Sequence, residues 1–229
     1  MQSAEDIIRG GLKPRRWARI QSVLEQRLGA VRVVLEDLHH PHNMSAVLRS
    51  CDAFGVQYVH AVEEPENFTV SRRITLGTQK WLTLRRHDTI AGCAEELRGA
   101  GFRLFAAVLN PQAVPLDRIP VDTPVALVFG NERAGVSSSA LDLCDGSYTI
   151  PMLGFAQSLN ISVAAAISLY SLTARVRQHR PDRGLLTAEE KARVIESWLP
   201  RSARWGQRAA RALGEELRSS TQSGETPYR

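Results

Sequence analysis

Short apolar segments of β-strand length alternate with helical segments along most of the chain. The clearest strand candidates are Val31–Leu35, Tyr58–Val62, Arg103–Leu109 and Val125–Phe129, all rich in residues that favour strands. A helical pattern lies between the first and second candidates, at Met44–Phe54, and another lies between the second and third, from Asp88 as a cap to Leu97. Parallel neighbours need a long crossover connection, which a helix normally provides. The alternation therefore predicts an α/β fold with a mainly parallel sheet and helices on both faces.

The remaining elements follow from the same patterns and from capping residues. Further helices are expected at Pro14–Arg27, from Asp88 as a cap to Leu97, and at Ser137–Leu143, Ser162–Arg177, Thr187–Trp198 and Arg201–Arg218. Trp81–Leu84 and Tyr148–Pro151 are further candidate strands, and Asn43 is expected to cap the helix that follows it. Pro200 is expected to separate the last two helices.

These elements predict a central domain with a short extension at each end. Residues 1–29 form the N-terminal basic helical extension, residues 30–180 the central domain, and residues 181–229 a C-terminal helical extension that ends in a disordered tail. A chain of 229 residues has room for one sizeable α/β domain, and a second large core is not expected.

Composition excludes several classes of protein. Hydrophobic residues make up 43% of the chain, no apolar run has the length of a membrane span, and the N-terminus lacks an apolar signal core. We therefore expect a cytoplasmic protein without a membrane partner. The three cysteines lie far apart, and the histidines at positions 39, 40 and 42 have no partners at ligand spacing, so no metal site is expected.

The net charge of +5 is distributed unevenly. Residues 1–32 carry +4, residues 33–171 carry −4 and residues 172–229 carry +5. Basic ends favour contact with a polyanion, although two solvated arginine-rich helix faces would give the same pattern. The candidate contacts are Arg15, Arg16, Arg19, Arg201, Arg204, Arg208 and Arg211. The last four are spaced three, four and three residues apart, so they share one helical face.

The common nucleotide-binding motifs are absent. The fingerprint G-x-G-x-x-G would follow the first strand, but the chain reads EDLHH there. Residues 130–135 hold two glycines without the Lys-Ser/Thr pair of a phosphate-binding loop. The chain is therefore not expected to bind a dinucleotide or ATP through either of these motifs.

Three other segments lie beside or just beyond expected strands. They are residues 43–55 (NMSAVLRSCDAFG), 129–135 (FGNERAG) and 150–164 (IPMLGFAQSLNISVA). In this order they resemble the three signature motifs of the SpoU branch of the SPOUT superfamily of RNA methyltransferases, over about residues 30–175. The resemblance implies a C-terminal trefoil knot, S-adenosylmethionine as the methyl donor, no metal, and a homodimer as the active form. Knots are rare among folds, so this expectation rests on the resemblance alone.

The resemblance also implies roles for individual residues. The cofactor pocket should include Ala107, Gly130, Ile150 and Leu159, with the glycine allowing the backbone to approach the ligand. The catalytic group should include Asn43, Arg49, Glu132, Ser158 and Asn160. Each has a simpler explanation beside this one: a helix cap for Asn43, Ser158 or Asn160, a surface ion pair for Arg49, and an exposed loop acid for Glu132.

Arg49 is central to the expected chemistry. Transfer of a methyl group to a ribose 2′-OH requires hydroxyl, methyl and sulfur to lie in line, and the hydroxyl must lose its proton. Because a guanidinium stays protonated, we expect Arg49 to bind the adjacent phosphate and polarise the hydroxyl rather than act as a base. In the family, this arginine and the cofactor loop meet across the dimer interface, so activity would require dimerisation.

The resemblance implies tRNA as the substrate. The lead-in LHHPHN at residues 38–43 and the short helical ends are most similar to those members that methylate guanosine 18 in the D-loop. Another tRNA position or rRNA is an alternative target, because all these enzymes share the three motifs. An inactive RNA-binding protein is an alternative of another class, against which the intact motif residues argue.

Overall fold

The structure is a computed structural model that describes residues 11–38, 40–62, 77–110 and 112–202. The chain divides into two compact units, one from Gln26 to Thr187 and one formed by the residues before and after it. No helix among the described residues is long and apolar enough to cross a membrane.

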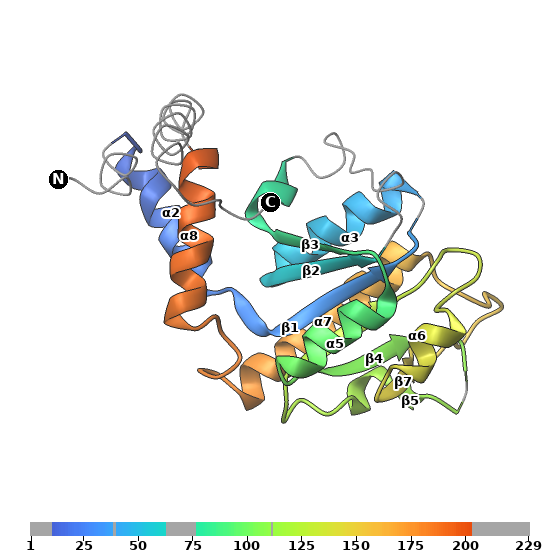
Figure 1. Cartoon of the computed structure of the whole chain (residues 1–229). Helices are drawn as coiled ribbons and strands as arrows, with labels where there is room; N and C mark the ends of the chain where they lie inside the picture. The colour runs from blue at the N-terminus through green and yellow to red at the C-terminus, as the bar shows by residue number, and fades with distance from the viewer. Residues whose placement is uncertain (1–10, 39, 63–76, 111, 203–229) are drawn as a thin grey trace, which may run out of the picture. The chain divides into compact units, whose positions relative to one another are not determined.

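The larger unit is built on a seven-stranded sheet in which all neighbouring strands are parallel. Across the sheet the order is β3 (Thr83–His87), β2 (Val56–Val62), β1 (Leu28–Glu36), β6 (Val125–Phe129), β4 (Arg103–Ala107), β7 (Gly146–Thr149) and β5 (Val114–Pro115) (Figure 1). The prediction of a parallel α/β sheet is confirmed.

Helices cover both faces of this sheet, as expected for a parallel sheet. The helices are α3 (Pro41–Phe54), α5 (Ile90–Gly99), α6 (Ser138–Asp142) and α7 (Ile161–His179), with short 3-10 helices η1 (Thr78–Trp81) and η2 (Leu116–Arg118). Val33 and Leu35 of β1 join the core formed with α3 and α7, whereas Val34 joins the core formed with α5. The alternation of side chains along β1 therefore assigns α3 and α7 to one face and α5 to the other.

The helix of the first motif begins earlier than expected, so the prediction of Asn43 as its cap is wrong. Helix α3 begins at Pro41, and its N-cap is His40. A proline suits the first turn because its fixed φ is helical and its missing N–H would have no partner there. Asn43 consequently lies inside the first turn and is only 9% exposed.

Other differences concern the ends of elements. The third strand runs from Thr83 to His87 rather than from Trp81 to Leu84, because Trp81 ends η1. Thr89, and not Asp88, caps α5, since its hydroxyl accepts a hydrogen bond from the N–H of Gly92 at 3.1 Å.

The smaller unit contains helices α2 (Pro14–Glu25) and α8 (Ala188–Ser202), which pack against each other. Ile20 and Leu24 of α2 and Trp198 of α8 are buried. Pro200 lies inside α8, so the expected break between two helices at this proline is wrong. At the end of a helix a proline removes at most one backbone hydrogen bond from the last turn.

The candidate RNA contacts fall partly within this unit. Arg15, Arg16, Arg19 and Arg201 are exposed. Arg204, Arg208 and Arg211, the rest of the expected helix Arg201–Arg218 and the expected disordered tail lie outside the described residues, as does His39.

Candidate functional site

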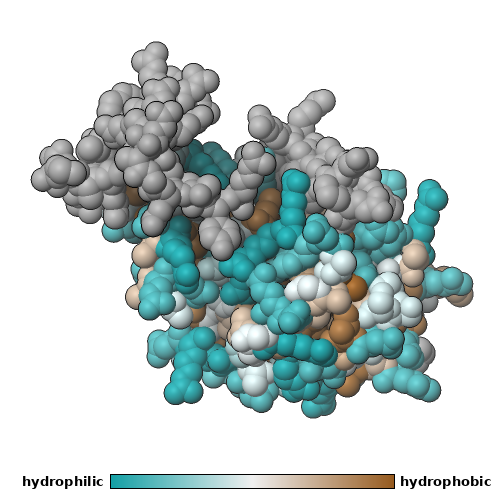
Figure 2. Space-filling view, viewed as in Figure 1, coloured by the Kyte–Doolittle hydropathy of each residue, from teal (hydrophilic) through white to brown (hydrophobic). Residues whose placement is uncertain are grey.

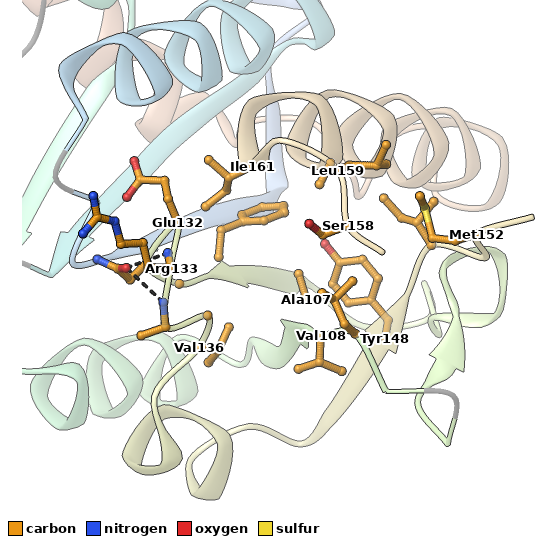
Figure 3. A pocket seen from close by; sticks show the side chains of 18 residues that line it. Ala107, Val108, Glu132, Arg133, Val136, Tyr148, Met152, Ser158, Leu159 and Ile161 are labelled. Carbon is orange, nitrogen blue, oxygen red and sulfur yellow. Dashed lines mark hydrogen bonds between the residues drawn. The ribbon is translucent and has the colours of Figure 1, made fainter. Parts of the chain in front are cut away.

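A pocket of about 430 Å³ lies at the carboxyl ends of β4, β6 and β7. In parallel α/β sheets this edge is the usual place for a ligand. Ala107, Gly130, Ile150 and Leu159, the four residues expected to surround a cofactor, all line the pocket, and so do Glu132 and Ser158 (Figure 3). The structure therefore brings the second and third motifs together around one cavity.

One wall of the pocket is the loop 130–136, which its own hydrogen bonds close. The backbones of Asn131 and Gly135 exchange two hydrogen bonds, both of 2.9 Å. The Asn131 side-chain oxygen accepts from the N–H groups of Arg133 at 2.8 Å and Ala134 at 3.1 Å. Such a ring of internal hydrogen bonds gives the loop a defined shape.

Gly130 is required for a reason that differs from the expected one. A Cβ at this position would lie 2.1 Å from the carbonyl oxygen of Gly135 and 2.3 Å from the nitrogen of Val136. The space beside Gly130 therefore holds the backbone of its own loop. Glycine allows that backbone to approach, which is a packing role that the sequence expectation did not contain.

The end of β1 holds both ends of this loop. The carboxylate of Glu36, which is 8% exposed, accepts hydrogen bonds from the Ser137 hydroxyl at 2.6 Å and the Ser137 N–H at 3.0 Å. The Asn131 side chain donates to the carbonyl of Asp37 at 2.9 Å. Ser137 also caps α6, since its hydroxyl accepts from the N–H of Ala140. None of these contacts between the end of β1 and the loop was predicted from the sequence.

A second network connects all three motifs. The Asn43 side-chain amide donates to the Glu132 carboxylate at 3.0 Å, and the Asn160 amide donates to the Asn43 side-chain oxygen at 3.2 Å. The backbone N–H of His40 also donates to Glu132, at 3.2 Å. The Asn160 side-chain oxygen accepts from the N–H of Ser162 at 2.8 Å and thereby caps α7. Asn160 is therefore a helix cap, as the simpler explanation for this residue has it, and it also contacts Asn43.

Glu132 is not a solitary loop acid. Burial acts to raise the pKa of this carboxyl, but the hydrogen bonds from Asn43 and from backbone N–H groups outweigh it, so the pKa is lowered. The carboxylate is therefore ionised at neutral pH, and it accepts hydrogen bonds rather than donating one.

Arg49 lies on α3 but outside the pocket. Its side chain is exposed, whereas Asn43 is buried, so the two occupy different faces of the helix as expected. Among the described residues, Arg49 has no hydrogen bond or ion pair. The simpler explanation, a surface ion pair, therefore finds no partner for Arg49 in the described part of the chain. Its guanidinium is open to a ligand.

Apolar side chains are exposed beside the pocket and along α7. Leu153 and Phe155 of the third motif have fully exposed side chains. Val163, Ile167 and Tyr170 are 45%, 38% and 67% exposed, and their spacing places them on one face of α7. By contrast, the face of the larger unit seen in Figure 2 is mostly hydrophilic, with hydrophobic side chains gathered near α5 and α6.

Comparisons with known proteins agree with this geometry. Residues 30–170 match the model of the SpoU rRNA Methylase family. The chain is 40% identical to the tRNA (guanosine(18)-2′-O)-methyltransferase of Thermus thermophilus, over 80% of this chain and 95% of that protein. It is 35% identical to the enzyme of the same name from Escherichia coli, over 82% and 84% of the two chains.

Two solved structures carry the comparison further. The Aquifex aeolicus TrmH/SpoU tRNA modifying enzyme has a TM-score of 0.73 and 34% identity, covering 81% of this chain and 95% of that one. The SpoU methyltransferase AviRb from Streptomyces viridochromogenes, solved with the cofactor AdoMet, has a TM-score of 0.56 and 25% identity, covering 66% and 58%.

Proposed function

The chain belongs to the SpoU rRNA Methylase family, and from this we propose that it is a tRNA 2′-O-methyltransferase that uses S-adenosylmethionine to modify guanosine 18. The observation that carries the proposal is the pocket into which the second and third motifs converge, connected to the first motif through Asn43. Two relatives with this named activity are 40% and 35% identical to the chain over about four fifths of its length.

The residues of the pocket fit S-adenosylmethionine. The pocket has a volume of about 430 Å³, which lies in the range of small-molecule sites. Ile150, Leu159 and Met152 offer apolar surface to an adenosine, and the ends of β4 and β6 offer backbone groups for hydrogen bonds. When bound, the cofactor supplies the methyl group, and the walls of the pocket fix its orientation.

In the proposed mechanism Arg49 binds the phosphate next to the target ribose and polarises its 2′-OH. The planar guanidinium suits a phosphate because it donates two parallel hydrogen bonds. Asn43, Glu132 and Asn160 hold the start of α3 against the pocket loops of the same subunit, so that these loops keep a fixed position around the methyl donor. Ser158, at the exposed side of the pocket, completes the group that orients the ribose.

We propose a homodimer as the active form, formed through α7 and the third motif. The five exposed apolar residues Leu153, Phe155, Val163, Ile167 and Tyr170 support this, because a monomer would leave them in water. A second copy of the chain is the occupant of this surface. Contact through the third motif would place Arg49 of one subunit near the pocket of the other, as the family resemblance implies.

The trefoil knot and the location in the cytoplasm belong to the same proposal. Strand β7 pairs with β4, yet α7, which follows it, packs against α3 and β1. Residues 150–160 must therefore lead the chain back past β6, which is a path that a knotted connection would follow. A tRNA substrate supports the proposal that the protein is located in the cytoplasm.

The decisive test of function is the position of the methyl group. We expect the purified chain to transfer one methyl group from S-adenosylmethionine to a tRNA transcript, at the ribose of guanosine 18. Nucleoside mapping by mass spectrometry would locate it, and a transcript with adenosine at position 18 should accept none. Methylation at another position or of rRNA would support the alternative targets, and no methylation of any RNA would support an inactive binding protein.

The basic ends are proposed to recruit tRNA, while the larger unit supplies the chemistry. Changing Arg15, Arg16 and Arg19 to glutamine should weaken tRNA binding and flatten its dependence on salt by about one counterion per lost phosphate contact. Affinity measured at several salt concentrations tests this, with cofactor affinity as the internal control. Unchanged affinity and slope would reduce these arginines to an ordinary solvated face.

Glu36 is expected to determine cofactor affinity through the loop 130–136. Glu36→Ala removes both hydrogen bonds to Ser137 and leaves a backbone N–H without its partner, which costs about 1–3 kcal/mol. We expect the dissociation constant for S-adenosylmethionine to rise about tenfold or more by calorimetry. Glu96→Ala is the matched control, because Glu96 forms an exposed ion pair with Arg85. Equal cofactor affinity in both variants would contradict the role of Glu36.

A further inference from the structure

Three side chains with metal-binding atoms meet on the α5 face of the sheet, away from the pocket. They are His60 of β2, His87 at the end of β3 and Cys93 of α5, and their ligand atoms all lie within 4.8 Å of one another. Because Val62 pairs with His87 and strands alternate with period two, both histidines point to the same face, where α5 covers them. None of the three lines the pocket of the proposed methyltransferase site.

The hydrogen bonding of His60 is incomplete. The residue is fully buried, as is Cys93. The Nδ1 atom of His60 lies 2.9 Å from the Nε2 atom of His87, while its own Nε2 atom is buried without a partner among the described residues. Buried polar atoms are nearly always satisfied, so a side chain in this state calls for an explanation.

Both imidazoles are in the form that binds metals. Burial is the largest cause that lowers the pKa of His60, to about 3, and nearby Arg32, His87 and Arg85 add to it. Burial also lowers the pKa of His87. Both rings are therefore neutral at pH 7 and carry a lone pair that a cation can accept.

We propose that His60, His87 and Cys93 bind a zinc ion that ties β2 and β3 to α5. Imidazole nitrogen and thiolate sulfur are both ligands of Zn²⁺, with Zn–N distances of about 2.0–2.1 Å and a Zn–S distance of about 2.3 Å. Tetrahedral geometry would place the bound ligand atoms about 3.3–3.6 Å apart, so the three side chains, whose ligand atoms lie within 4.8 Å of one another, need to move closer together around the ion. A water molecule completes the coordination from the side of the half-buried His87.

The surrounding charges and the proton balance are compatible with this site. Arg32 and Arg85 oppose a cation, but Glu96, one helical turn after Cys93, forms an ion pair with Arg85. Burial raises the pKa of the Cys93 thiol to about 12, so the thiol is protonated without metal. Zinc binding forms a Zn–S bond, and the thiol releases its proton to water. The site lies away from the pocket and takes no part in methyl transfer.

A zinc titration of the full chain, first stripped with chelator and dialysed, tests the proposal. We expect one equivalent to bind and the midpoint of thermal unfolding to rise. Cobalt(II) should give a thiolate charge-transfer band that Cys93→Ser abolishes. Cys93→Ser and His87→Gln should each lower zinc affinity by roughly tenfold or more, and His87→Gln provides the test if the cysteine variant fails to fold.

Matched controls separate this site from other cysteines and histidines. Cys144→Ser removes a partly exposed thiol outside the cluster, and His42→Ala removes an exposed histidine from the sequence cluster near α3. Both should retain full zinc affinity. Absence of binding at micromolar free zinc, or a loss in the controls as large as in Cys93→Ser, would overturn the proposal. Methyl transfer in chelator should continue, which keeps the zinc site distinguishable from the proposed function.

Discussion

Replacing Arg49 with alanine is expected to abolish methyl transfer while the affinity for S-adenosylmethionine stays within about twofold of the starting value. The reason is geometric: Arg49 is exposed on α3 and does not line the pocket, whereas the residues proposed to bind the cofactor come from the loops after β4, β6 and β7. Single-turnover methylation and cofactor calorimetry on the same preparation would measure the two properties separately.

The lysine variant sharpens this test. Arg49→Lys keeps the charge but loses the planar fork that donates two parallel hydrogen bonds, so we expect it to be nearly as inactive as alanine. Arg118→Ala is the matched control, because it removes an exposed arginine of η2 that lines no part of the pocket. Failure of the Arg49 variants to bind cofactor would show that Arg49 belongs to the cofactor site instead.

Introducing a charge on the exposed face of α7 is expected to separate the proposed dimer and eliminate activity. Ile167→Asp would bury an unpaired carboxylate between two copies of the chain, which is among the most costly changes at an interface. Light scattering should report a monomer, and methyl transfer to tRNA should be lost, because each active centre of the proposed dimer needs parts of both copies.

The control for this prediction is Leu141→Asp. Leu141 on α6 is 40% exposed against 38% for Ile167, so both substitutions add the same charge to similarly exposed aliphatic positions, but only one lies on α7. Tyr170→Glu, at a 67% exposed position, is a second variant of the same face that tests the interface if Ile167→Asp fails to fold. A stable dimer in both α7 variants, or a fully active monomer, would contradict the proposed interface.

The order of elements could be predicted from the sequence, but their ends depended on tertiary contacts. Val125–Phe129 was predicted with its observed bounds, because a fully buried strand is apolar throughout. The start of α3 was misplaced, because Asn43 has the side chain of a typical cap. Its amide instead contacts Glu132 and Asn160, which are distant in sequence, and local preference cannot anticipate such partners.

The pocket residues were identified through the family resemblance rather than through any physical pattern. Ala107, Gly130, Ile150 and Leu159 do lie around one cavity, and their roles toward the cofactor stay predictions. Glu36 was missed because a single acid at the end of a strand has no characteristic spacing. Its partner Ser137 is 101 residues away, and only the pairing of β1 with β6 brings the two together.

The crowding beside Gly130 also limits how this chain can vary. Even alanine would place a methyl group within 2.1 Å of the Gly135 carbonyl oxygen, which is backbone and cannot rotate away as a side chain could. Any substitution at position 130 would push the two ends of the loop apart and move Glu132 and the wall of the pocket with them. Among viable variants of this chain, position 130 should thus be invariant.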